Sequence, residues 1–130
     1  MRGLLLVGLL AGCPEEEPPP CITVDLACQA GYVPTYDNVF ENTLSVNCGS
    51  TQSACHSATG RAGGLSFADQ PTAYALLLQE GRVKPFDPAC SEMIVRTSSP
   101  GHDYQMPPGD PLSPEERCAL IQWVQNGAMQ

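Results

Sequence analysis

Residues 113–128 read SPEERCALIQWVQNGA, and they carry the clearest secondary-structure signal in the chain. Ser113 and Glu116 have the spacing of a capping box, and Pro114 suits the first turn of a helix. Gly127 is a typical residue at a helix end. Apolar side chains recur along one face of the expected helix: Leu120, Ile121 and Val124. The pattern predicts an amphipathic helix that packs on a core.

Three shorter helices are expected before this one. They cover a stretch from about Asp37 to before Cys48, residues 71–79, and a stretch from after Pro88 to about Arg96. The 12 glycines and 13 prolines place much of the remaining chain in loops, above all at residues 56–64 and 98–112. The sequence shows no internal repeat and no convincing strand. We therefore expect a small all-α domain with long loops.

Length and charge limit what the chain can be. Its 130 residues allow one domain, and 42% hydrophobic residues allow a packed core. The formal net charge is −8, with 6 Lys and Arg against 14 Asp and Glu. An acidic chain does not attract phosphate backbones, so nucleic-acid binding is excluded as a function.

The first residues have the character of an export signal. Residues 1–12 combine one charge, at Arg2, with a short apolar stretch. Residues 10–13 read LAGC and resemble the lipobox of bacterial lipoproteins, which implies cleavage before Cys13 and lipid attachment to its sulfur. Residues 13–20, rich in Pro and Glu, are expected to form an extended tether. The domain would then span residues 21–130 and be lipid-anchored in a bacterial cell envelope, at the periplasmic or outer-membrane face.

The chain has seven cysteines, and lipid attachment at Cys13 would leave an even number. In an exported protein, an even number suggests that every thiol is used. Cys21 and Cys28 bracket a short segment, and we expect them to close it as a local disulfide. Cys90 and Cys118 are expected to join the third helix to the last one.

A cysteine–histidine sequence stands in the middle of the chain. Residues 48–56 read CGSTQSACH. A c-type haem site needs two thiols and a histidine directly after the second one. The opposite side of the iron takes a ligand from a distant loop, and Met106 in YQMPP could provide a thioether there. His102 is the competing ligand, although its surroundings favour a solvated loop residue.

The order of these features resembles small cytochrome c-like domains of exported bacterial proteins. The resemblance covers residues 36–128 and is strongest at Met106-Pro107-Pro108 and in the last helix with Trp123. It implies a haem c with four protein contacts: thioethers to Cys48 and Cys55, a proximal ligand at His56 and a distal ligand at Met106. The implied function is electron transfer through an exposed haem edge, and not catalysis as an enzyme.

One departure from the family pattern leaves alternatives open. Six residues separate Cys48 from Cys55, whereas the usual attachment motif has two. The two cysteines could instead form a disulfide in a haem-free, disulfide-stapled lipoprotein module with a binding or structural role. A zinc site with His56 and a small peroxidase with an open iron position are weaker alternatives; a Met106 ligand argues against the peroxidase.

The resemblance to cytochrome c-like domains also predicts which residues surround the haem. Apolar packing around the haem is expected from five side chains: Phe40, Leu76, Leu77, Ile121 and Trp123. Trp123 is most simply a core aromatic, and it would lie near the porphyrin edge if haem is bound. Met93 is expected in the core. An acidic surface favours a basic redox protein as the partner.

Overall fold

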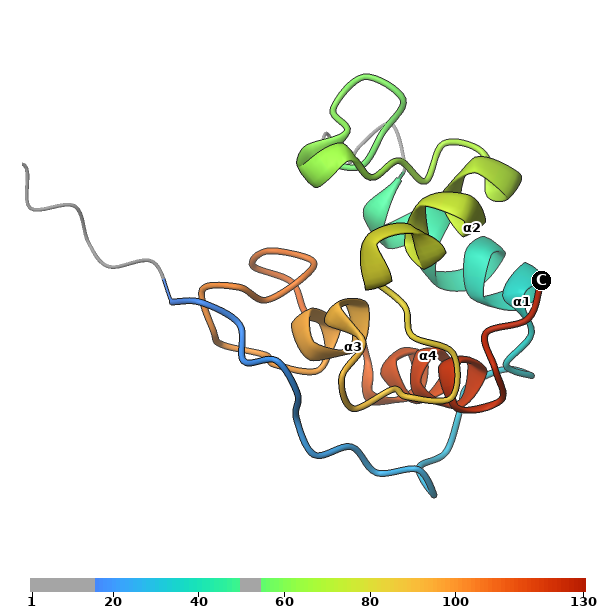
Figure 1. The fold of residues 1–130 in the computed structure, drawn as a ribbon, viewed down its shortest axis with the longest axis vertical. Helices are drawn as coiled ribbons and strands as arrows, with labels where there is room; N and C mark the ends of the chain where they lie inside the picture. Colours follow the sequence, from blue (N-terminus) through green and yellow to red (C-terminus); the bar gives the residue numbers. More distant parts are fainter. Residues whose placement is uncertain (1–15, 50–54) are drawn as a thin grey trace, which may run out of the picture.

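The computed structural model describes residues 16–49 and 55–130, except for the side chain of Glu80. The helical elements in chain order are α1 (Tyr36–Val39), η1 (Phe40–Cys48), η2 (Ala62–Gly64), α2 (Gln70–Leu78), η3 (Gln79–Gly81), α3 (Glu92–Thr97) and α4 (Pro114–Gln125). These described ranges contain helices and loops only (Figure 1), which confirms the expected all-α class. None of the helices described there is long and apolar enough to span a bilayer.

The helix before Cys48 differs from the prediction at both ends. It begins after Thr35, whose hydroxyl accepts a hydrogen bond from the backbone N–H of Asn38 at 3.4 Å. Asp37 is not the N-cap but lies in the first turn. Its negative charge there interacts favourably with the helix dipole. Beyond Val39 the backbone widens into π-helical turns that continue through Cys48. The helix therefore carries this cysteine on its last turn.

The two helices with the clearest end signals are confirmed. The carboxylate of Asp69 accepts a hydrogen bond from the N–H of Thr72 at 3.0 Å and caps α2. At the start of α4, the N–H of Glu116 donates to the Ser113 hydroxyl at 3.1 Å. The Ser113 N–H in turn donates to the Glu116 carboxylate at 2.9 Å, which completes the capping box. The capping box was predicted from residue type and spacing, whereas the Asp69 cap was not.

Ser113→Ala should lower the free energy of unfolding by about 1 kcal/mol, because it leaves an N–H at the start of α4 without its acceptor. Urea unfolding followed by circular dichroism measures this loss. Ser98→Ala is the matched control, since the Ser98 hydroxyl oxygen is buried without a hydrogen-bond partner. Its removal should be neutral or slightly stabilising. Equal losses in the two variants would contradict the capping argument.

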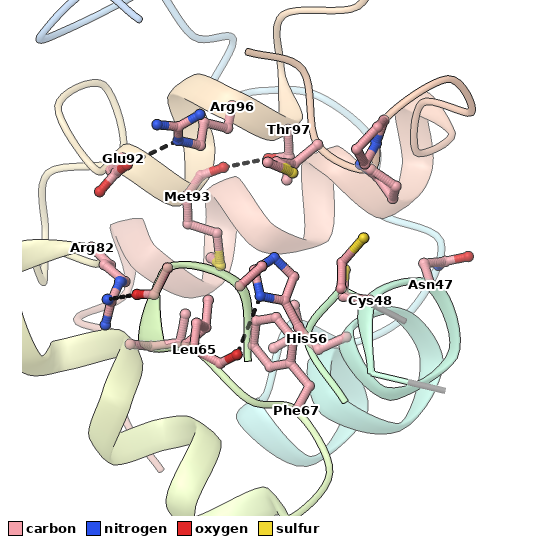
Figure 2. Close-up of a pocket in the computed structure, with 18 of the residues that line it drawn as sticks. Asn47, Cys48, His56, Leu65, Phe67, Arg82, Glu92, Met93, Arg96 and Thr97 are labelled. Carbon is pink, nitrogen blue, oxygen red and sulfur yellow. Dashed lines mark hydrogen bonds and ion pairs between the residues drawn. The ribbon is translucent and has the colours of Figure 1, made fainter. Parts of the chain in front are cut away.

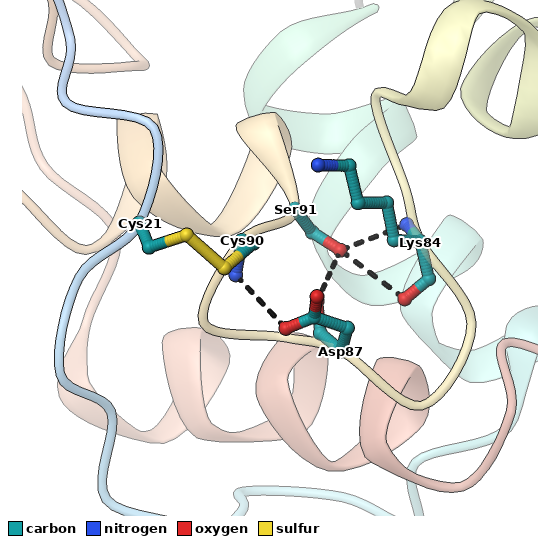
Figure 3. Close-up of a disulfide and its surroundings, with 5 residues drawn as sticks. All are labelled: Cys21, Lys84, Asp87, Cys90 and Ser91. Atoms are coloured by element: carbon teal, nitrogen blue, oxygen red, sulfur yellow. Dashed lines mark hydrogen bonds between the residues drawn. A yellow bond between two sulfur atoms is a disulfide. The ribbon is translucent and has the colours of Figure 1, made fainter.

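The third helix is shorter than expected. It starts at Glu92, because a turn at residues 87–91 precedes it. The Ser91 hydroxyl donates to the backbone carbonyl of Asp87 at 2.8 Å, and the Cys90 N–H donates to the Asp87 carboxylate at 3.2 Å (Figure 3). Side chains of this kind offer the backbone an alternative to helical hydrogen bonds. The helix can begin only after the turn is complete.

Aromatic side chains connect the first, second and last helices. The ring of Tyr36 stacks on Trp123 with 5.3 Å between the ring centroids, and Tyr74 meets Tyr36 edge-on at 4.9 Å. The indole N–H of Trp123 donates to the carbonyl of Met129 at 2.9 Å. Helix α4 also packs against α3. Trp123 is 2% exposed, which confirms it as a core residue.

Both predicted disulfide pairings are wrong. The structure joins Cys21 to Cys90 (Figure 3) and Cys28 to Cys118. The reason is the path of residues 16–35, which run alongside α3 and α4 before reaching α1 (Figure 1). Each cysteine of this segment therefore meets the helix region that it passes.

Hydrogen bonds to backbone carbonyls fix the same path. The N–H of Ile22 donates to the carbonyl of Ala89 at 2.9 Å, and the side-chain amide of Gln122 donates to the carbonyl of Cys28 at 2.8 Å. The expected tether is only partly described, and the predicted lipidation site, Cys13, lies outside the described residues. Glu16 of the tether contacts the long loop, where its carboxylate pairs with His102 at 2.9 Å. This hydrogen bond lowers the pKa of Glu16.

Candidate functional site

A single cavity of about 330 Å³ brings the sequence-derived candidates together. Its wall is built from η1, the segment around His56, α3 and the loop between α3 and α4 (Figure 2). All four residues that the sequence assigned to haem binding line it: Cys48, Cys55, His56 and Met106. Residues far apart in the chain are thus gathered around one space.

Cys48 lies on the last turn of η1 and is buried. The next residue has to be a glycine: a Cβ on Gly49 would come within 2.5 Å of the Cβ of Phe67. This close approach places the segment that contains Phe67 directly against the end of η1. Burial, followed by the negative charge of Glu116, raises the pKa of the Cys48 thiol to about 12. The thiol is therefore protonated at neutral pH.

His56 is oriented through one of its two ring nitrogens. Its Nδ1 lies 3.3 Å from the carbonyl oxygen of Leu65, so Nδ1–H is the donor (Figure 2). The N–H of Phe67 donates to the carbonyl of His56 at 2.8 Å, and the two rings meet edge-on. Histidines that bind metals commonly donate their other ring N–H to a backbone carbonyl. The arrangement leaves Nε2 with the lone pair that a metal ligand needs.

Met106 is held by backbone contacts to α3. Its N–H donates to the carbonyl of Arg96 at 3.0 Å, and the Arg96 guanidinium reaches the carbonyl of Tyr104 at 3.5 Å. The side-chain amide of Gln105 donates to the carbonyl of Pro107 at 2.8 Å. These contacts fix the part of the long loop that carries the thioether.

The apolar wall differs from the one expected. It consists of six large side chains: Leu44, Leu65, Phe67, Leu77, Met93 and Leu112. Of the five apolar residues predicted around the site, only Leu77 lines the cavity; Phe40, Leu76, Ile121 and Trp123 do not. The indole stacks on Tyr36 in the core between α1 and α4, so the expectation of a place near the porphyrin edge is wrong. Met93 is buried as predicted and also lines the cavity.

The alternatives can be compared with this geometry. Cys48 and Cys55 both carry thiols, so the disulfide between them that the haem-free module requires is not formed. Within residues 16–49 and 55–130, no three His, Cys, Asp or Glu side chains are grouped as metal ligands. His102 is exposed, as expected, and stacks on Tyr104. It is not among the residues that line the cavity.

Charged residues at the cavity were missed by sequence reasoning. Arg82, Glu92 and Arg96 line the wall together with the apolar side chains. The four-residue spacing of Glu92 and Arg96 could have predicted their ion pair, which has a length of 2.8 Å. No local pattern indicated that Arg82 would reach the same space.

Comparison with known families agrees with the geometry. Residues 53–110 match the family model described as Planctomycete cytochrome C. The chain contains a cytochrome c-like domain. The matched stretch includes Cys55, His56 and Met106 and begins after Cys48. No curated protein and no solved structure matches the chain.

The match confirms the resemblance found in the sequence. The family description is consistent with a haem-binding electron carrier. The residues of the cytochrome c-like domain fit a haem: thiols, an imidazole and a thioether face one apolar cavity, and the cavity volume lies in the range of small-molecule sites.

Proposed function

We propose that the protein is a lipid-anchored, c-type monohaem electron carrier. One observation carries the proposal: the two thiols, the imidazole and the thioether of Cys48, Cys55, His56 and Met106 line the same apolar cavity. Cys48 and Cys55 contribute to this wall although six residues separate them in the sequence. Their place in one wall supports a shared ligand despite the unusual spacing.

Each residue has a distinct role in this proposal. Cys48 and Cys55 hold the haem through thioethers, and His56 and Met106 provide the axial ligands. The bound haem supplies one-electron redox chemistry, and His/Met ligation raises its reduction potential. The hydrogen bond to the Leu65 carbonyl keeps the His56 ring in its orientation. The apolar wall excludes water and lowers the local dielectric constant.

The proposal also covers where the protein is located and which partner it exchanges electrons with. A lipid on Cys13 attaches the domain to a membrane of the bacterial cell envelope, on its periplasmic or outer-membrane face. The net charge of −8 attracts a redox protein with a basic surface. Electrons pass by outer-sphere transfer, without a bond between donor and acceptor.

A pyridine haemochrome spectrum tests the covalent haem. The chain is exported in a host with cytochrome c maturation, and we expect a c-type band that remains after acid–acetone extraction. Cys55→Ala should reduce the covalently held haem at least about tenfold, because Cys55 directly precedes the proposed ligand. Ser57→Ala is the matched control from the same loop, outside the cavity wall, and should keep the band. A colourless wild-type protein would overturn the proposal.

A further inference from the structure

The cavity has a charged side as well as a thiol side. Arg82, Glu92 and Arg96 line it, and in Figure 2 they lie across the cavity from Cys48, with His56 between. The whole chain contains only six Lys and Arg residues. Two of these few cations thus face a largely apolar space in an acidic protein. A purely apolar ligand gives no reason for them.

Both guanidinium groups are held in place by the protein. Arg82 donates from Nη1 to the carbonyl of Leu76 at 3.0 Å and from Nη2 to the carbonyl of Gly63. Arg96 donates from Nε to the Glu92 carboxylate at 2.8 Å and reaches the Tyr104 carbonyl from Nη1. A guanidinium carries five N–H donors, so the contacts of Arg96 with Glu92 and Tyr104 leave further donors on that group. Fixed cations lose little side-chain entropy when an anion binds.

Guanidinium groups bind carboxylates strongly, because their planar donors match the two oxygens. A largely apolar cavity with two such groups on one side would suit an apolar ligand that carries carboxylates along one edge. In haem, the vinyl groups that form thioethers and the two propionate groups lie on different edges of the ring. The cavity likewise has Cys48 on one side and Arg82 and Arg96 on the opposite side.

We propose that Arg82 and Arg96 bind the two propionate carboxylates of the porphyrin. This inference rests on the proposed haem function and assigns the ligand's orientation in the cavity. Glu92 has an opposing effect: its carboxylate neutralises part of the charge of Arg96 and repels a second carboxylate. The two arginines therefore favour binding of a dicarboxylate ligand, and Glu92 weakens that preference.

Porphyrin binding tests the inference without covalent haem. The chain is produced in a host that lacks cytochrome c maturation and is titrated with protoporphyrin IX and with its dimethyl ester, which has no carboxylates. We expect the free acid to bind at least about tenfold more tightly, because hydrogen bonds between charged groups are stronger than those between neutral groups. The double variant R82Q/R96Q should bind the two porphyrins equally.

Three further variants separate recognition from structural support. R82K/R96K keeps both charges and should retain part of the preference for the free acid. R61Q removes an exposed arginine outside the cavity wall and should leave the preference unchanged. E92Q should increase the preference, which a merely structural role for Arg96 does not explain. If R82Q fails to fold because it loses its carbonyl contacts, R96Q and E92Q decide the question.

The outcomes distinguish this inference from the haem proposal. Equal binding of the two porphyrins by the wild-type protein would overturn the role of the arginines and leave the haem site standing. A preference that persists in R82Q/R96Q would do the same. A folded wild-type protein that binds neither porphyrin would overturn both proposals.

Discussion

Met106→Ala should lower the reduction potential of the haem-loaded protein and open the distal side of the iron to added ligands. A thioether stabilises the reduced iron, so its loss favours the oxidised form. We expect the equilibrium constant for reduction to fall at least about tenfold, which corresponds to about 59 mV for one electron. Spectroelectrochemical titration measures the reduction potential. Titration with imidazole shows whether the distal side of the iron binds an added ligand.

Met93→Ala is the matched control. Met93 lines the same cavity, but it lies in α3 and belongs to the buried core. Its removal should lower stability without changing the ligands of the iron, because the proposal assigns the distal position to Met106. The opposite pattern, in which Met93→Ala opens the iron and Met106→Ala does not, would move the distal ligand to α3.

The sequence predicted those helices whose ends are encoded locally. The capping box of Ser113 and Glu116 gave the start of α4, and the helix expected over residues 71–79 lies within one residue of α2 at each end. The start of α3 could not be predicted in this way, because the Ser91 side chain forms a turn with the Asp87 carbonyl that competes with the helix. Residue spacing does not show which of these two hydrogen-bond patterns is formed.

The candidate site likewise contains residues that the sequence predicted and residues that it did not. Cys55, His56 and Met106 carry chemistry that can be read from residue type, and the structure places all three at one cavity. Arg82 and Leu65 reach that cavity through contacts between distant segments. The Arg82 guanidinium, for example, donates to the carbonyl of Gly63, nineteen residues away. Such contacts depend on how the loops fold over the helices, for which the sequence has no periodic signal.

The disulfides illustrate this limit best, and removing one should have the largest effect on stability. Cys28→Ser with Cys118→Ser opens a link between residues 90 positions apart. In the chain-entropy model a loop of this length contributes about 4.5 kcal/mol, which is a large part of the stability of a small domain. Urea unfolding of variant and wild type, prepared with the same haem content, measures the loss.

Cys21→Ser with Cys90→Ser is the companion variant, and its link spans 69 positions. Because loop entropy grows only with the logarithm of length, the two variants should lose nearly equal free energy. The pairing itself is checked by peptide mapping: the first variant must keep a Cys21–Cys90 peptide, and the second a Cys28–Cys118 peptide. Local pairing of Cys21 with Cys28 would instead close a loop of few residues, and breaking it would cost clearly less. A small loss in both variants, or a Cys21–Cys28 peptide in the wild type, would therefore contradict the path of residues 16–35 beside α3 and α4.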